Sequence, residues 1–321
     1  MTQGNRPAVD AIEEAVAVID PVFLDTPVVR NEGLDRALGR ELALKVETLT
    51  PIRSFKGRGA SYLMHRLGAA AARGVVCASA GNFGQGVAHA GRRSGVSVTV
   101  YAATAANPLK LTAMRAFGAE VRLDGRDFDA AKAAAQAFAA ESGRHFAEDG
   151  ADPSIAEGAG TIGLEMDRAD ALGDLTLVAL GNGSLINGVG TWVKARRPGT
   201  RVVGLVAVGA PSMYLSWREG RVVETPEVAT IAEGIAVRVP VPAALEAMRG
   251  TVDEVILVDD APMLAAVRLL HETVGLLVEP TGAIGVAALL ADPALGRGRR
   301  VSTILCGGNV TPAQARAWLL D

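Results

Sequence analysis

Short apolar runs alternate along this chain with longer segments in which apolar residues recur at helical spacing. The apolar runs predict strands over 41–47, 75–78, 97–101, 120–123, 176–180, 202–206, 255–258 and 301–305. The segments between them predict helices, among them 61–72, 84–94, 109–117, 128–141, 185–196, 262–273 and 313–320. Strands that alternate with helices in this way are typical of parallel sheets covered on both faces. The pattern therefore predicts an α/β protein.

Glycine is frequent, at 37 of 321 residues, and it gathers in short loops that follow a strand and open a helix. Ligands of open α/β sheets bind at this carboxyl end of the strands. The chain shows no repeat and no low-complexity linker. A compact group of β/α units over 50–148 predicts a small domain, and 1–49 together with 149–321 predict a larger one.

The charge pattern excludes several classes of partner. The chain has 32 basic and 35 acidic residues, a net charge of −3, and no basic stripe, which disfavours a nucleic-acid partner. Its apolar runs are too short to span a membrane, and the N-terminus lacks a signal-peptide layout. Two cysteines make no disulfide framework, so we expect a cytoplasmic protein. The four histidines lack metal-ligand spacing, so no metal is expected.

The segment 51–60 carries one of only five lysines, Lys56, between Phe55 and two glycines. Lysine, unlike arginine, can shed its proton and act as a nucleophile. A plain exposed lysine at a helix start is the alternative interpretation.

Two glycine-rich loops are candidate anion sites. The loop from Ser79 to Gly86 follows a strand and precedes a helix, where backbone N–H groups suit a carboxylate or phosphate. The loop from Gly181 to Gly188 indicates a phosphate cradle at a helix start. It lacks the third glycine of the dinucleotide fingerprint, where Ile186 stands, and no Walker lysine follows. A small phosphoester therefore fits better than NAD, although tight packing of a helix start would also explain the glycines.

Two further segments lie at the ends of predicted elements. Cys306 directly follows the last strand, at the ligand edge, although a free cysteine is most often a small buried apolar residue. Glu279 comes just before a predicted helix, where a carboxylate is also ordinary helix-start charge.

Together and in this order, these segments resemble the fold type II family of pyridoxal-phosphate enzymes, in the branch of serine/threonine dehydratases and serine racemases. The resemblance runs from Thr26 to the Cys306 loop and includes 160–165 and 230–234. It implies two doubly wound domains with parallel-rich sheets, as in the tryptophan synthase β-like fold, with pyridoxal phosphate in the cleft between them. It also implies a homo-oligomer, such as a dimer, and a small amino-acid substrate.

The resemblance also implies roles for single residues. Lys56 would be the Schiff-base lysine, Phe55 would pack on the cofactor ring, Asn82 would bind the ring hydroxyl and Cys306 would face the pyridine nitrogen. Gly234 and Glu279 would lie beside the cofactor. The phosphate cradle would consist of Gly181, Asn182, Gly183, Ser184 and Leu185. The substrate carboxylate would be held by the loop of Ser79, Ala80, Gly81, Asn82 and Phe83.

The chain departs from the branch at four places. Asn182 and Ser184 interrupt a loop that usually consists of glycines, so the geometry of phosphate binding is open. Cys306 replaces the usual serine; a neutral thiol is a poor proton source, which favours prompt loss of a β leaving group. Ala80 stands where racemases carry a serine as second base, so racemization should be minor. Val206 replaces the glutamate of the branch's cation site.

These features predict a pyridoxal-phosphate-dependent dehydratase, or ammonia-lyase. It would convert a β-hydroxy L-amino acid of the threonine/serine type to a 2-keto acid and ammonia. Lys56 would remove the Cα proton, and the cofactor phosphate or a bound water would protonate the leaving hydroxyl. The alternatives are a dehydratase for a β-aryl-serine or hydroxyaspartate, a β-replacement synthase, and a non-catalytic binding protein on the same fold. An NAD oxidoreductase is more remote.

Overall fold

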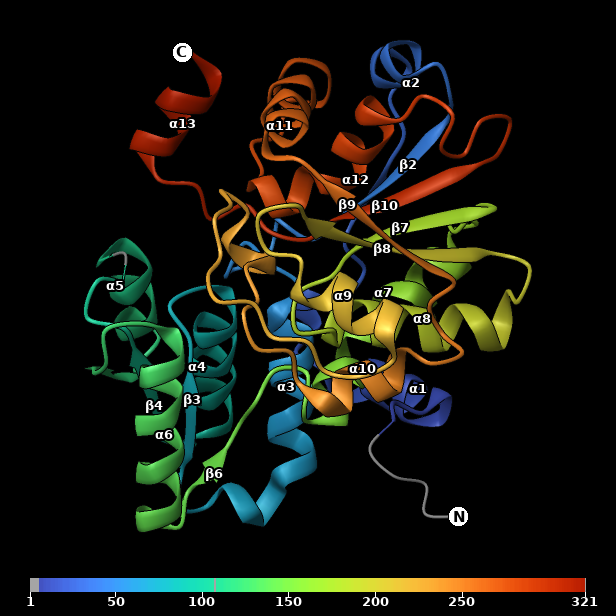
Figure 1. The fold of residues 1–321 in the computed structure, drawn as a ribbon. Helices are drawn as coiled ribbons and strands as arrows, with labels where there is room; N and C mark the ends of the chain where they lie inside the picture. Colours follow the sequence, from blue (N-terminus) through green and yellow to red (C-terminus); the bar gives the residue numbers. More distant parts are fainter. Residues whose placement is uncertain (1–5, 107, 321) are drawn as a thin grey trace.

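Two sheets organise the molecule in the computed structural model, which describes residues 6–106 and 108–320 (Figure 1). The larger sheet has the order β1-β2-β10-β7-β8-β9. Its strands are β1 (Val28–Val29), β2 (Leu42–Val46), β7 (Leu175–Ala179), β8 (Arg201–Ala207), β9 (Glu254–Val258) and β10 (Val301–Leu305). All neighbours run parallel except β1 and β2, which are antiparallel.

The smaller sheet is parallel throughout, with the order β5-β4-β3-β6. Its strands are β3 (Val75–Ala78), β4 (Val98–Ala102), β5 (Glu120–Leu123) and β6 (His145–Phe146). The fold class is therefore confirmed: the protein is α/β with parallel-rich sheets. All eight predicted strands are present, with ends shifted by a residue or so. The division of the chain at residues 49/50 and 148/149 stays a prediction.

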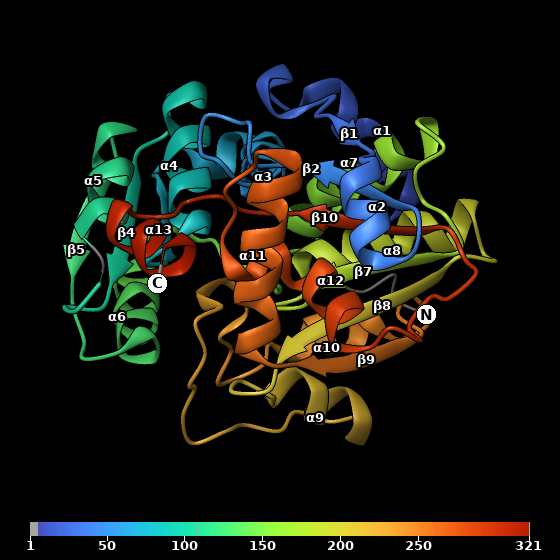
Figure 2. The ribbon, with the colours of Figure 1, turned by 90° about the horizontal axis from the view of Figure 1, so that it is seen from above.

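Helices cover both faces of each sheet (Figures 1 and 2). They are α1 (Val9–Val18), α2 (Glu32–Leu38), α3 (Lys56–Leu67), α4 (Asn82–Ser94), α5 (Pro108–Ala116), α6 (Phe128–Ser142), α7 (Pro153–Arg168), α8 (Ser184–Arg196), α9 (Ser212–Glu219), α10 (Pro242–Met248), α11 (Asp260–Val274), α12 (Pro280–Ala291) and α13 (Pro312–Leu319). Short 3-10 turns are η1 (Pro21–Phe23), η2 (Gly68–Ala71) and η3 (Glu233–Ile235). The larger sheet lies between α7 and α8 on one face and α11 and α12 on the other, and α4 and α6 flank the smaller sheet.

The helix predicted over 61–72 begins five residues earlier, at Lys56, and becomes a 3-10 turn at Gly68. Two glycines in its first turns, Gly57 and Gly59, obscured this start because glycine disfavours helix interiors. Both pack too closely for a side chain. A Cβ on Gly57 would lie 2.2 Å from the Phe23 ring, and one on Gly59 would lie 2.5 Å from the Ile155 carbonyl oxygen. Close tertiary packing thus overrides the local preference and places Lys56 at the head of α3.

The core of the larger unit surrounds its sheet, with Ala159 and Ile162 of α7 and Ile186 and Val189 of α8 among its buried residues, and α7 also packs against α3. Thirteen consecutive residues of α7, from Ser154 to Met166, are buried. Three glycines of α7, Gly158, Gly160 and Gly163, have no side chain and so let the backbones of α3 and α8 come close. In the described part of the chain, no helix is both long and apolar enough to cross a membrane.

Candidate active site

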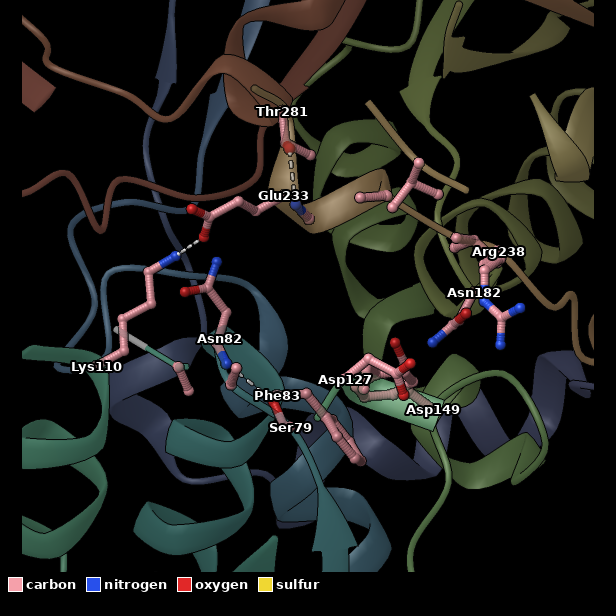
Figure 3. A pocket seen from close by; sticks show the side chains of 18 of the residues that line it. Ser79, Asn82, Phe83, Lys110, Asp127, Asp149, Asn182, Glu233, Arg238 and Thr281 are labelled. Carbon is pink, nitrogen blue, oxygen red and sulfur yellow. Dashed lines mark hydrogen bonds and ion pairs between the residues drawn. The ribbon is translucent and has the colours of Figure 1, made fainter. Parts of the chain in front are cut away.

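A cavity of about 1040 Å³ opens between the two sheets (Figure 3). The predicted site residues that line it are Phe55, Lys56, Ser79, Ala80, Gly81, Asn82, Phe83, Asn182, Gly234, Glu279 and Cys306. A small adjoining cavity of about 30 Å³ is lined by the phosphate-cradle residues Gly181, Asn182, Gly183, Ser184 and Leu185, together with Lys56 and Cys306. The structure therefore brings all the predicted residues to one place, from segments far apart in the sequence.

The Lys56 side chain lines both cavities and does not face solvent. It is the first residue of α3, and its side chain is only 15% exposed. Its Nζ donates to Asp149 Oδ2 at 2.6 Å and to Ser184 Oγ at 3.2 Å. The same Nζ lies 4.6 Å from the centre of the Phe55 ring. The amine is thus held between a carboxylate and the start of the proposed phosphate cradle, which argues against the interpretation of an exposed lysine.

Asp149 is a site residue that the sequence analysis missed. It follows β6, a strand of two residues that is too short to show an alternating pattern. Recognising that strand would have placed Asp149 at the ligand edge of the smaller sheet. Its side chain is 11% exposed, Oδ2 accepts from Lys56, and Oδ1 is buried with no hydrogen-bond partner among the described atoms.

Asn82, at the start of α4, belongs to a network that joins the two sheets. Its Nδ2 donates to Glu279 Oε1 at 3.0 Å, and its Oδ1 accepts from Asn309 Nδ2 at 2.8 Å. Glu279 Oε1 also accepts from the Asn309 backbone N–H at 2.8 Å. Asn82 Nδ2 also donates to the second carboxylate oxygen, Glu279 Oε2, at 3.4 Å, so the amide faces the Glu279 carboxylate at the cavity wall. Asn309 is a second residue that the sequence analysis did not select.

The Ser79 loop has fewer free donors than predicted. The Ser79 N–H donates to the Tyr101 carbonyl at 2.9 Å within the sheet, and the Gly81 N–H donates to Ser79 Oγ at 3.1 Å. Ser79 Oγ accepts from Gly84 N–H as well, at 3.0 Å, so its own proton is left to donate outward. The backbone donors of the first turn of α4 have no intrahelical acceptors and suit an anion.

The Gly181–Leu185 loop leads into α8, a helix of 13 residues. Gly183 caps it with a φ of +95°, a conformation that favours glycine, and the structure describes no side-chain hydrogen bond as its cap. Gly150 supports the loop from behind: its φ is +89°, and a Cβ there would lie 2.1 Å from the Asn182 carbonyl oxygen. The helix start therefore presents backbone N–H groups and a positive dipole end to the cavity, as a phosphate site requires.

Cys306 directly follows β10 and lines both cavities. Burial, together with the nearby Glu279 carboxylate, raises the pKa of the Cys306 thiol to about 12. The thiol is therefore neutral at physiological pH, and its Sγ lies 3.8 Å from the Thr281 carbonyl oxygen.

Two ion pairs close over the cavity from opposite sides. Lys110 of α5 pairs with Glu233 of η3, as Figure 3 shows, and Arg238 donates through Nε to Asp129 of α6 at 2.6 Å. Each pair joins a helix that covers the smaller sheet to the 221–241 segment of the larger unit. None of these four residues was predicted, because only the packing of the two units brings them together.

Behind Lys56, a buried cluster of charges anchors α3. Arg58 is fully buried and donates to Glu47 Oε2 at 2.8 Å and to Glu165 Oε1 at 2.6 Å. Glu165 Oε2 also accepts from Lys45 Nζ at 2.5 Å. Burial alone would raise the pKa of Glu165, but the hydrogen bonds and charges of Arg58 and Lys45 hold it below its ordinary value. The two carboxylates raise the pKa of Arg58 despite its burial, so Arg58 stays charged.

These groups fit pyridoxal phosphate. They include a lysine amine that is 15% exposed and lies beside an aromatic ring, a helix start without a side-chain cap for a phosphate, and the Asn82 amide at the cavity wall for a ring oxygen. A neutral thiol is present as a weak partner for a ring nitrogen. Asn182 and Ser184 interrupt the glycines of the predicted phosphate cradle, but the loop still leads into the start of α8.

Comparison with known proteins agrees with this chemistry. The profile of the family described as "Pyridoxal-phosphate dependent enzyme" matches residues 19–307. The chain belongs to this family, and pyridoxal phosphate is its cofactor.

The relatives that this chain resembles place it in the branch of serine/threonine dehydratases. An L-threonine ammonia-lyase of Geobacter sulfurreducens is 38% identical over 288 residues, which are 89% of this chain and 71% of the relative. A second L-threonine ammonia-lyase, of Thermotoga maritima, is 36% identical over 93% of this chain and 75% of its own length. The processed threonine deaminase isoform 2 of Solanum lycopersicum has a TM-score of 0.89 at 30% identity, over 98% of this chain and 88% of that one. The expected family and cofactor are thus confirmed.

Proposed function

We propose that the protein removes water from a β-hydroxy L-amino acid, with threonine or serine as the first candidates, and so forms a 2-keto acid and ammonia. The observation that carries the proposal is the position of Lys56. Its amine lies in the cavity, 3.2 Å from Ser184 at the start of the phosphate cradle. Relatives that share most of the chain act as L-threonine ammonia-lyases, which supports the same reaction here.

Bound pyridoxal phosphate supplies an electron sink for the negative charge that develops at Cα. The residues of the chain then divide the remaining tasks. Lys56 takes the Cα proton, because its amine lines the cavity next to Ser184 at the start of the proposed phosphate cradle. The Ser79 hydroxyl and the first turn of α4 hold the substrate carboxylate and so fix which Cα bond faces Lys56.

Cys306 and Ala80 restrict the outcome. The neutral Cys306 thiol does not stabilise a long-lived carbanion, so loss of the β-hydroxyl follows promptly. Ala80 lines the cavity without a group that can transfer a proton. The site therefore favours elimination over racemization.

The first experiment is a titration followed by visible absorption. The purified protein, loaded with pyridoxal phosphate, is mixed with L-serine, L-threonine, a β-aryl-serine or hydroxyaspartate, and 2-keto acid is assayed in parallel. We expect the cofactor band to shift and keto acid to form with threonine or serine. A shift with only a bulkier amino acid would transfer the proposal to that substrate. No shift with any of them would contradict the elimination.

Substituting Lys56→Ala tests the assignment of the base. We expect turnover to fall by about 10³-fold or more, because both the cofactor attachment and the proton acceptor are lost. Lys194→Ala is the matched control: Lys194 pairs with Asp253 on the other side of α8, and we expect no change. Turnover retained in Lys56→Ala would contradict the mechanism.

We also propose a homodimer that works in the cytoplasm. Both cysteines are free and buried, which suits a reducing compartment. Light scattering on the eluting protein tests the dimer, and a monomer mass would contradict it.

A further inference from the structure

The Lys56–Asp149 pair contains a carboxyl group that the mechanism above does not use. We propose that Asp149 is the acid of the reaction: it receives the proton that Lys56 gives up and passes it to the departing β-hydroxyl. This inference rests on the proposed elimination and replaces the cofactor phosphate or a water as the proton donor.

The contact between the two groups supports the first transfer. An amine must lose its proton before it can act as a nucleophile or base. The acceptor closest to Lys56 is Asp149 Oδ2, at 2.6 Å, while the other partner, Ser184 Oγ, lies at 3.2 Å. A carboxylate takes up such a proton far more readily than a hydroxyl does.

The burial of Asp149 supports storage of the proton. The carboxyl group is 11% exposed, Lys56 is its ion-pair partner, and Oδ1 has no partner among the described atoms. A buried carboxylate that loses its cation is costly unless it is neutralised. In the proposed relay, the proton that leaves Lys56 moves to Asp149 and removes both charges of the pair together.

Other charged groups near Asp149 are already paired. Lys132 and Glu148 form an ion pair with each other, and Asp129 pairs with Arg238; Lys132, Glu148 and Asp129 line a second cavity of about 90 Å³ with Asp149. Lys56 is therefore the cation that exchanges a proton with Asp149.

The position of Asp149 supports the second transfer. It lines the main cavity together with Ser79, Phe83 and Asn182, so it faces the space between the proposed carboxylate loop and the cradle. It also comes from the smaller sheet, whereas Cys306 and Gly234 belong to the larger unit. A substrate held by the Ser79 loop has its β-carbon in this space.

The proton balance closes in each turnover. Lys56 nitrogen takes the Cα proton, the electron pair of the Cα–H bond forms the Cα–Cβ double bond, and the Cβ–O bond breaks. The leaving oxygen takes the pair of that bond and the proton of the Asp149 carboxyl group, and departs as water. Asp149, now a carboxylate, receives the proton that Lys56 has just taken.

Asp149→Asn tests the relay through the leaving group. Loss of a hydroxyl needs a proton, whereas loss of chloride does not. For L-threonine or L-serine, we expect kcat to fall by about 100-fold or more, the usual effect of losing a general acid. For β-chloro-L-alanine we expect a change below about threefold, because its leaving group needs no acid. Glu148→Gln, the neighbouring carboxylate paired with Lys132, is the control and should alter neither rate.

Infrared difference spectra give a readout independent of turnover. Loading with pyridoxal phosphate should produce the carbonyl stretch of a protonated carboxylic acid, which Asp149→Asn should lack and Glu148→Gln should keep. The variant should also bind the cofactor, visible as its absorption band. If Asp149→Asn does not fold or does not load, Asp149→Glu retains an acid at the site and should keep both the carbonyl signal and the elimination of threonine.

The outcomes separate the two proposals. Equal loss of activity toward threonine and β-chloro-L-alanine, or no carbonyl signal in the loaded wild type, would overturn the relay. Loss of both the signal and the threonine reaction in Asp149→Glu would overturn it as well. If the wild type eliminates from neither amino acid, the proposed function itself fails.

Discussion

Single side chains around Lys56 decide which proton transfers the cavity can perform. Asp149 offers a carboxyl group at 2.6 Å from the lysine, Cys306 offers only a neutral thiol, and Ala80 offers nothing. The proposed mechanism therefore assigns the proton transfers to Lys56 and Asp149, which contact each other, and Ala80 has no group that can transfer a proton.

Ala80→Ser adds the missing group. We expect racemization of L-serine to rise relative to elimination, because a second hydroxyl on the loop can return a proton to Cα. Chiral chromatography of D-serine against keto acid measures the ratio. Ala105→Ser, which adds a hydroxyl elsewhere on the cavity wall, is the control. An unchanged ratio in Ala80→Ser would contradict the role assigned to this position.

Elements position the cavity through close backbone contacts. The phosphate cradle at the start of α8 rests against the loop after β6, where Gly150 touches the Asn182 carbonyl oxygen. The two segments are far apart in the sequence. Their backbones can approach closely because Gly150 has no side chain. The cradle's geometry thus depends on a residue outside it.

Gly150→Ala tests this support. Its Cβ would lie 2.1 Å from Asn182 O, so the cradle must shift, and we expect the affinity for pyridoxal phosphate to fall by about tenfold or more, about 1.4 kcal/mol. Fluorescence titration of the cofactor measures this. Gly220→Ala is matched in strain, with φ of +66°, but its Cβ meets nothing within 4 Å. It should lose about 1 kcal/mol of stability and keep its cofactor affinity. Equal affinity for pyridoxal phosphate in both variants would contradict the role assigned to Gly150.

At the scale of the whole molecule, buried charges tie the helix that carries Lys56 to the larger unit. Arg58 on α3 contacts Glu47 at the end of β2 and Glu165 on α7. The pairs Lys110–Glu233 and Arg238–Asp129 also bridge the units, but Glu233 is 56% exposed and the second pair is about one-third exposed, so solvent screens both pairs more than the Arg58 cluster. The buried cluster is therefore the stronger electrostatic link.

The contribution of the cluster to stability can be tested with Glu165→Gln and with the pH dependence of unfolding. Removing one carboxylate from a buried pair should cost about 3–5 kcal/mol of unfolding free energy at pH 7. Because folding holds the pKa of Glu165 below its ordinary value of 4.5, its stabilisation is present above that pH and is lost as the pH falls through the folded-state pKa. Urea unfolding between pH 7 and pH 3 should thus show a smaller decrease in the variant. Glu13→Gln, which breaks an exposed pair with Arg196, should behave like the wild type; the same result for Glu165→Gln would contradict the cluster's role.

Much of the fold was predictable because it depends on local patterns. Most parallel strands are short segments rich in apolar and β-branched residues, such as Val75–Ala78 and Val301–Leu305, which the sequence displays directly. The two-residue strands β1 and β6 were not predictable, because two residues carry no periodicity. The start of α3 was misplaced, because Gly57 and Gly59 suit tertiary packing and not helix propensity.

The sequence by itself determined the α/β class, the glycine loops at strand ends and the single lysine among them, since these follow from the order of residue types. Only the tertiary structure decided which groups meet that lysine and which groups pair with one another around the cavity. Asp149, Asn309, Lys110 and Arg238 lie far from Lys56 along the chain and carry no motif. Their contacts arise from the packing of the two sheets, and no local pattern encodes a distance between segments that only the folded core brings together.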